Sequence, residues 1–218
     1  MKRLALTILF VGNSLTYFNE MPWMFEQVAK SKGVTLRAHF AGFSGRTLRQ
    51  QYGDARVRSA IADGHYDVVV LQPQSGELFR AEEETTRYAR LLDREIRASG
   101  ARTMVFETWA RPPLTAAQYA ERYAALARDL KAPLAPVGSA WARLQARGYV
   151  LGDETGHPNI TGSYLAACVF FKAITGRSPA GATHTFDVHF QIPEAYRWSL
   201  EHDRIDAATA EAIQRAAE

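Results

Sequence analysis

The expected strand Asp67–Leu71 contains four consecutive apolar residues, and it restricts the possible folds more than any other segment. A strand with one face in water alternates apolar and polar residues, whereas a parallel strand that is covered on both faces can be apolar throughout. Four further segments have the length and composition of strands: Leu4–Val11, Val34–Ala41, Ala101–Thr108 and Pro133–Val137. We therefore expect five buried strands in one parallel sheet.

Segments with the period of a helix alternate with these strands. They cover Pro22–Ser31, Thr47–Ala62, Glu82–Ser99, the region after the capping pair Thr115 and Gln118, Ser139–Arg147, Ile160–Thr175 and Ala207–Ala217. Such alternation is typical of a parallel sheet with helices on both faces. Because a length of 218 residues suits one domain, we predict a single three-layer α/β/α domain over residues 1–218. The stretch from Ser178 to Trp198 is expected to be irregular.

The charge balance argues against a nucleic-acid partner. The chain has 26 basic and 23 acidic residues, a net charge of +3 and no arginine cluster along one face. Cys168 is the only cysteine, which excludes an internal disulfide. Its apolar neighbours in the sequence indicate a core thiol.

The N-terminus has a charged start followed by the apolar run Leu4–Val11, which superficially resembles a signal peptide. The run lacks a small-residue cleavage site and leads directly into Gly12-Asn13-Ser14, so a buried first strand explains it better. No apolar run approaches the roughly 18 residues that a membrane helix needs. We expect a cytoplasmic protein without a membrane partner, and the sequence does not indicate an oligomeric state.

Polar and glycine residues follow four of the predicted strands. The four segments are Gly12–Ser14, Gly42–Gly45, Gln72–Ser75 and Glu107–Arg111. In open α/β sheets, ligands bind beyond the carboxyl ends of the strands. Amide and hydroxyl groups that converge on this edge are what an oxyanion-binding site requires.

Ser14 is the candidate nucleophile, because Gly12 permits a sharp turn directly after the first strand. The alternative is that Asn13 and Ser14 only form an Asx or Ser turn. A serine hydroxyl is a poor nucleophile until a base removes its proton. The catalytic interpretation therefore depends on a histidine.

His157 is the best candidate among the six histidines. Asp153 and Glu154 lie four and three residues before it, and Pro158 and an apolar helix follow it. A carboxylate that accepts from Nδ1–H leaves Nε2 as the base and stabilises the imidazolium. A serine, an acid and a histidine in this order indicate a serine esterase.

The remaining histidines are assigned no chemical role. They are His39 in a strand, His65 in a turn, and His184, His189 and His202 in the C-terminal region. His184, Asp187 and His189 resemble a metal cluster, but neither a helix nor a hairpin is predicted there to fix their geometry. We therefore expect neither a metal nor a cofactor.

The motifs resemble those of the SGNH (GDSL-type) hydrolase superfamily, which consists of esterases, lipases and carbohydrate deacetylases with a flavodoxin-like fold. Gly12-Asn13-Ser14-Leu15 resembles its first block, and Gly45 its second-block glycine, whose N–H serves the oxyanion hole. Gln74 occupies the third-block position, and Glu154 with His157 matches the last block. The resemblance covers a catalytic core of about residues 4–176 and leaves a C-terminal tail of residues 177–218. It implies an oxyanion hole formed by Ser14, Gly45 and Gln74.

This sequence departs from the family pattern at three positions. Asn13 replaces the usual first-block aspartate, and Gln74 replaces an asparagine, with Gln72 as a rival donor. Glu154 stands where the family has aspartate, with Asp153 beside it. The register favours Glu154 as the acid, but spacing alone does not decide between the two carboxylates. A backbone carbonyl is a further alternative for orienting His157.

The resemblance implies hydrolysis of short acyl esters, with an acetylated carbohydrate as the first choice. The residues that could bind the substrate are Tyr17, Phe18, Phe43, Trp109 and Tyr164, with Arg46 and Arg111 for a polar leaving group; packing and surface roles are the alternatives. The main rival function is an inactive protein that binds a small ligand on the same fold. A flavin or nucleotide binder is less well supported, because no glycine-rich phosphate loop follows the first strand.

Overall fold

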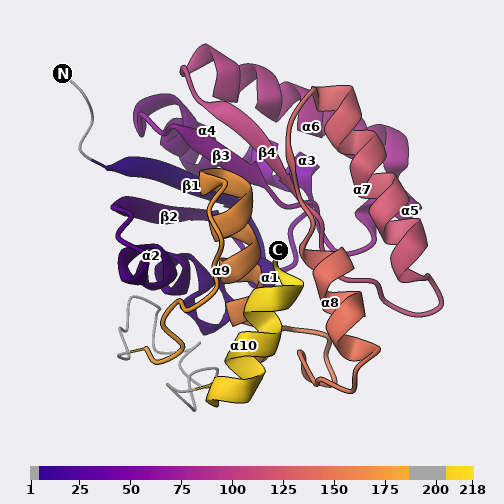
Figure 1. The fold of residues 1–218 in the computed structure, drawn as a ribbon. Coiled ribbons are helices and arrows are strands. Elements are labelled where there is room, and N and C mark those ends of the chain that lie inside the picture. Colours follow the sequence, from indigo (N-terminus) through magenta and orange to yellow (C-terminus); the bar gives the residue numbers. More distant parts are fainter. Residues whose placement is uncertain (1–4, 187–204) are drawn as a thin grey trace.

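The computed structural model describes residues 5–186 and 205–218, and it contains a five-stranded parallel sheet (Figure 1). The strands are β1 (Leu6–Gly12), β2 (Leu36–Gly42), β3 (Val68–Leu71), β4 (Arg102–Phe106) and β5 (Leu134–Ala135). Their order in the sheet is β2-β1-β3-β4-β5, and all four neighbouring pairs are parallel. The predicted flavodoxin-like α/β fold is confirmed.

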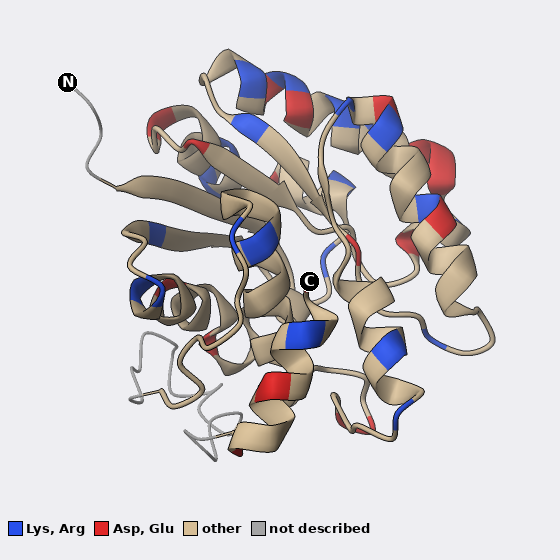
Figure 2. Ribbon diagram, viewed as in Figure 1, with Lys and Arg blue, Asp and Glu red and all other residues tan. Residues whose placement is uncertain are grey.

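Eleven helical segments surround the sheet within the described residues. They are α1 (Ser14–Tyr17), η1 (Phe18–Glu20), α2 (Met21–Ser31), α3 (Leu48–Gly53), α4 (Ala55–Asp63), α5 (Glu77–Arg80), α6 (Glu82–Ala98), α7 (Ala116–Leu130), α8 (Val137–Gln145), α9 (Ile160–Thr175) and α10 (Ala207–Ala216). Acidic and basic residues are interspersed on the outer helices α6 and α7 (Figure 2). These mixed charges are typical of helix faces in water.

Successive residues of each inner strand enter different halves of the core, because strand side chains alternate between the two faces of a sheet. Ile8 and Phe10 of β1 belong to a cluster with α2, α8, α9 and α10. Leu9 and Val11 belong to a second cluster with α3, α4, α6 and α7. Both clusters are buried, which explains why the inner strands are apolar throughout and gives the three predicted layers.

Two helices differ from the sequence prediction because of side-chain capping. The predicted helix Thr47–Ala62 is two helices, because Asp54 has extended backbone geometry and its side chain accepts from Arg56 N–H. Helical structure also begins at Ser14 rather than near Pro22. There the Asn13 side chain accepts from Leu15 N–H at 3.1 Å, which caps α1.

The C-terminal helix α10 contributes to the core beside α8 and α9. Gln214 Nε2 donates to the Tyr164 hydroxyl at 2.8 Å and to the Ala182 carbonyl at 3.0 Å. Tyr164 and Cys168 of α9 are fully buried, and burial raises the pKa of the Cys168 thiol to about 12. Cys168 is therefore the core thiol that the sequence predicted. Among the helices of the described ranges, we find none whose length and hydropathy would allow it to cross a bilayer.

Candidate active site

Ser14 lies at the start of α1, directly beyond the carboxyl end of β1. The preceding residue fixes this turn through three groups: Asn13 N–H donates to Gln72 Oε1 at 2.8 Å, and Asn13 Nδ2 donates to the Arg46 carbonyl at 3.3 Å, while its Oδ1 caps α1. These hydrogen bonds connect the turn to Arg46 in the loop after β2 and to Gln72 directly after β3. Ser14 is only 5% exposed.

His157 lies in a short loop whose two ends are joined to each other. Gly152 and Pro158 form an isolated bridge, and Asp153 N–H donates to the His157 carbonyl at 2.9 Å. The imidazole stacks on Phe18, with ring centroids 4.2 Å apart and an interplanar angle of 12°. Phe18 therefore packs against the candidate base as well as following the serine turn.

Asn19 joins the serine segment to the histidine segment. Its Nδ2 donates to the Pro158 carbonyl at 2.9 Å and to Ser163 Oγ at 2.9 Å. Ser163 Oγ in turn donates to the Phe18 carbonyl at 3.1 Å. These buried hydrogen bonds connect η1 with the start of α9, which follows the histidine loop.

The two predicted reacting side chains meet at this edge of the sheet. His157 Nε2 lies 2.9 Å from Ser14 Oγ, although 143 residues separate them in the sequence. This distance is within the range for a nucleophile and its general base. The other ring nitrogen is then available for an orienting group.

The group that contacts this nitrogen is a hydroxyl, and not Glu154, which the family register favoured. His157 Nδ1 lies 2.6 Å from Thr155 Oγ1, and Thr155 Oγ1 donates to Asp153 Oδ1 at 2.6 Å. Asp153 Oδ1 also accepts from His157 N–H at 3.0 Å. Glu154 is exposed and makes no hydrogen bond to any residue in the described ranges. The geometry brings Asp153, through Thr155, to the candidate base.

The pKa values of the two groups are shifted in directions that suit these roles. Burial lowers the pKa of His157 and the nearby Arg111 lowers it further, while Asp153 acts in the opposite direction. Partial burial raises the pKa of Asp153, but hydrogen bonds from Thr155 and His157 N–H outweigh this and hold it below 3.8. At neutral pH the imidazole is neutral and the carboxylate is ionised.

Two of the predicted oxyanion donors are backbone N–H groups. The N–H groups of Ser14 and Gly45 have no hydrogen-bond acceptor within the described part of the chain. Gln72 is occupied, because its Oε1 accepts from Asn13 and Thr16 while its Nε2 donates to the Pro73 carbonyl.

The other glutamine keeps a donor available. Gln74 Oε1 accepts from Arg80 at 2.5 Å, whereas Gln74 Nε2 has no acceptor among the described residues. Of the two glutamines that the sequence offers as third donor, Gln74 is therefore the one whose side-chain N–H groups are not already donated to a described residue.

Trp109 and Arg111, both predicted to bind substrate, contact the histidine loop. Trp109 Nε1 and Arg111 Nη2 donate to the Gly156 carbonyl at 3.1 and 3.0 Å. Trp109 is 4% exposed and stacks on Trp141, with centroids 4.0 Å apart. The structure thus gives Trp109 and Arg111 contacts that hold the loop of the base.

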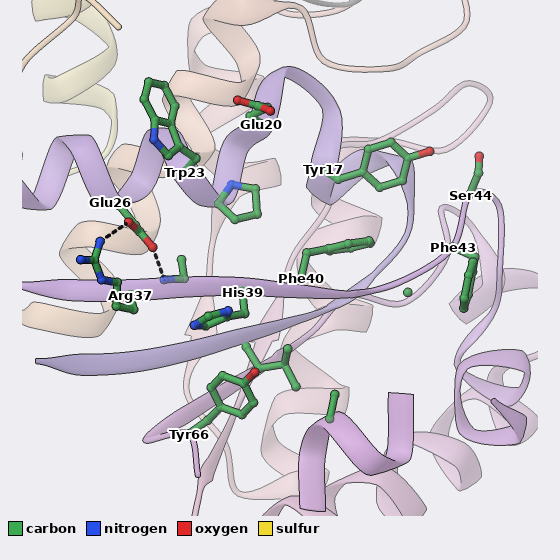
Figure 3. Close-up of a pocket in the computed structure, with 15 residues that line it drawn as sticks. Tyr17, Glu20, Trp23, Glu26, Arg37, His39, Phe40, Phe43, Ser44 and Tyr66 are labelled. Atoms are coloured by element: carbon green, nitrogen blue, oxygen red, sulfur yellow. Dashed lines mark hydrogen bonds and ion pairs between the residues drawn. The ribbon is translucent and has the colours of Figure 1, made fainter. Parts of the chain in front are cut away.

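A cavity of about 780 Å³ runs along edge strand β2 (Figure 3). Tyr17, Phe43 and Ser44 line one end of this edge groove, and Glu26 and Arg37 line the other. Tyr17 belongs to the same short helix as Ser14, and Ser44 directly precedes Gly45. One end of the edge groove is therefore formed by residues close in sequence to Ser14 and Gly45, whereas Ser14 and His157 themselves are not among its lining residues.

The lining of the edge groove combines aromatic rings with charged groups. Phe40, His39 and Tyr66 lie between its two ends, and Arg37 pairs with Glu26 at 3.3 Å (Figure 3). The ring of Phe43 lies 4.3 Å from the guanidinium carbons of both Arg46 and Arg56. Of the residues predicted to bind substrate, Tyr17 and Phe43 line the edge groove, whereas Trp109 and Arg111 do not.

Sequence reasoning missed Thr155 and Asn19. The pattern Asp153-x-Thr155-x-His157 was a possible signal, since a hydroxyl midway between an acid and a base can contact both. The metal-like group in the tail is not assembled within the described residues, where no set of three such ligands occurs. His184 Nδ1 pairs with the Ile205 carbonyl at 2.7 Å, while Asp187, His189 and His202 lie outside the described residues.

Comparison with known proteins identifies the class of fold. A candidate SGNH hydrolase from Slackia heliotrinireducens is 27% identical, with a TM-score of 0.64 over 78% of this chain and 99% of that one. A DUF4886 family protein from Bacteroides uniformis is 17% identical, with a TM-score of 0.73 over 98% and 93%. The acetylxylan esterase Axe2 from Geobacillus stearothermophilus is 16% identical, with a TM-score of 0.64 over 80% and 96%.

These structural neighbours confirm the resemblance to the SGNH hydrolase superfamily that the motifs suggested. Neither a protein-family profile nor a curated protein sequence matches the chain. The similarity therefore supports a hydrolase of the SGNH type, and the particular substrate has to be argued from the site itself.

Proposed function

We propose that this protein is a serine esterase that hydrolyses short acyl esters, acetyl esters in particular. The observation that carries the proposal is the 2.9 Å distance between Ser14 Oγ and His157 Nε2. An unprotonated Nε2 at that distance can accept the serine proton as the hydroxyl attacks an ester carbonyl. The lowered pKa of His157 favours this unprotonated form.

In the proposed reaction, Ser14 Oγ attacks the carbonyl carbon while its proton passes to His157 Nε2. The N–H groups of Ser14 and Gly45, with Gln74 Nε2, stabilise the oxyanion of the tetrahedral intermediate. The intermediate collapses as Nε2 returns the proton to the leaving alcohol. A water molecule then attacks the acyl-serine with the same base, which releases the acid and restores Ser14. Asp153 stays ionised throughout and stabilises the imidazolium.

We propose an acetylated carbohydrate as the substrate, with its sugar units in the edge groove. Aromatic rings such as Phe40 and Tyr66 can pack against the apolar faces of sugars, and charged side chains such as Arg37 can bind their hydroxyl groups. Tyr17, three residues after Ser14, lines one end of the edge groove, so a sugar chain with its acetyl ester at the catalytic groups would follow β2 from that end.

The reaction is tested with a chromogenic acetyl ester and a serine-reactive phosphonate. We expect turnover by the wild-type protein and covalent labelling of Ser14, detected by mass spectrometry of the labelled peptide. If the protein shows neither turnover nor labelling but still binds a sugar ligand, the result would instead favour the inactive binding protein.

The edge groove is tested with the double variant Arg37→Ala/His39→Ala. Losing charged and polar contacts should lower kcat/KM for an acetylated xylo-oligosaccharide by roughly tenfold. The chromogenic acetyl ester, which is too small to follow β2, should react at the wild-type rate. Arg128→Ala on the exposed face of α7 is a matched control. Equal activity of the double variant and the wild-type protein on both substrates would exclude the edge groove as the sugar site.

The pH dependence of kcat/KM should report the base. Activity falls when His157 becomes protonated, and because its pKa lies below the ordinary 6.5, the acidic half of the profile should be centred below that pH. Removing the Arg111 charge in Arg111→Gln should raise this pKa and move the loss of activity to higher pH. A kcat/KM that stays constant from about pH 4 to about pH 8 would contradict a histidine base.

A further inference from the structure

The carboxylate of Asp153 is held by its own loop rather than by the imidazole. Its Oδ1 accepts from the Thr155 hydroxyl at 2.6 Å and from His157 N–H at 3.0 Å. Within the described residues, no hydrogen bond joins this carboxylate to the ring of His157. The only hydrogen-bond partner of His157 Nδ1 there is Thr155 Oγ1, at 2.6 Å.

The chemistry of the three groups fixes the direction of each hydrogen bond. An ionised carboxylate only accepts, so the single proton of the Thr155 hydroxyl must point to Asp153. The hydroxyl oxygen then offers lone pairs to its other neighbour, and His157 Nδ1 must be the donor. A proton on Nδ1 leaves the lone pair of the neutral ring on Nε2, which faces Ser14.

We propose that Thr155 is a positioning residue that couples Asp153 to His157, an inference that rests on the esterase function proposed above. Its hydroxyl orients the imidazole and holds the neutral ring in the tautomer with the proton on Nδ1. Because the hydroxyl donates to Asp153, the negative charge of the carboxylate makes its oxygen a better acceptor for that Nδ1 proton. When Nε2 takes the serine proton, Nδ1 keeps its own proton and Thr155 keeps its own. The hydroxyl, polarised by Asp153, stabilises the positive ring.

The proposal explains why the acid of this chain lies four residues before the histidine rather than three. The side chain of Asp153 closes its own loop and a separate hydroxyl spans the remaining distance to Nδ1. Glu154 is in the family register but makes no hydrogen bond to a described residue, whereas Asp153 accepts two. Thr155 thereby takes the place that a directly bonded carboxylate would occupy.

The test compares Thr155→Val, which keeps the shape and removes the hydroxyl, with Thr155→Ser, which keeps the hydroxyl. We expect Thr155→Val to lower kcat by roughly 10²-fold with KM within about threefold, since orienting partners of a histidine typically contribute this much. Its pH profile should also move to lower pH, because the imidazolium loses an acceptor. Thr155→Ser should restore kcat to within about fivefold of the wild type. Thr86→Val on α6 makes the same chemical change outside the site.

Two further results keep the outcomes distinct. If Ser14→Ala abolishes activity while Thr155→Val keeps the wild-type kcat and pH profile, the esterase stands and the role of Thr155 is refuted. If Ser14→Ala is fully active, the proposed function itself fails. The wild-type protein offers a test that does not depend on the folding of a variant. The ¹⁵N NMR chemical shifts of the His157 ring should show the proton on Nδ1 at neutral pH. A neutral ring protonated on Nε2 would overturn the proposal.

Discussion

Ser14→Ala is expected to lower kcat for a chromogenic acetyl ester by roughly 10⁴- to 10⁶-fold, the range seen when a serine hydrolase loses its nucleophile. Among the described residues, the Ser14 hydroxyl is the only hydrogen-bond partner of His157 Nε2, at 2.9 Å, so it is the hydroxyl that this imidazole is positioned to deprotonate. The fold should be unaffected, because the substitution removes one oxygen atom and adds no bulk. Steady-state kinetics, with circular dichroism as a check on folding, measures the effect.

His157→Ala should cause a loss of the same order, and the double variant should lose little more than either single variant. Residues that act as one unit have non-additive effects, since removing either partner already stops the reaction. Additive losses would mean that the two side chains act independently. Wild-type turnover by Ser14→Ala would refute the proposed mechanism altogether.

Gly42→Ala is expected to have the largest effect on stability. A Cβ at Gly42 would lie 2.0 Å from the carbonyl oxygen of Gly12, and the backbone φ of +151° disfavours any residue with a side chain. Because Gly12 pairs with Gly42 in the sheet, one of the two strands must shift. We expect a loss of about 3 kcal/mol in the free energy of unfolding, measured by urea denaturation.

The same variant should also lose esterase activity, because Gly12 is two residues before Ser14. Gly53→Ala at the end of α3 is the matched control, since nothing lies within 4 Å of a Cβ built there. That change should leave stability unchanged or raise it slightly, as alanine is the better helix former. Equal stabilities of the Gly42 and Gly53 variants would contradict the close approach of β1 and β2.

Secondary structure was predictable where one local signal dominated. The helix Ile160–Thr175 has the bounds that its apolar composition and the following glycine indicated. The short helix α1 was missed, because four residues are too few to show a period and its start depends on one side chain, Asn13. The sequence predicts one helix over Thr47–Ala62, because helix propensities do not reveal that Asp54 ends one helix and caps the next.

The candidate site was predictable in its residue types but only partly in its contacts. Ser14 and His157 were recognisable because each stands in a motif at the end of a strand or before a buried helix. Sequence spacing could not separate Asp153 from Glu154, since adjacent residues in a loop reach different places when the backbone turns. The sequence predicts Trp109 at the substrate; in the structure its N–H donates to Gly156 of the histidine loop and its ring stacks on Trp141, contacts that sequence spacing does not reveal.

The sequence by itself determined the parallel three-layer fold, through apolar runs that can only be buried on both faces. The sequence also identified Ser14 and His157 as the two candidate reacting residues, because each lies in a short motif that can be recognised without the fold. Only the tertiary structure decided that Thr155 lies between Asp153 and His157 and that a groove runs along edge strand β2. Those features depend on side-chain direction and on how distant loops pack, and a difference of one residue in a loop changes both.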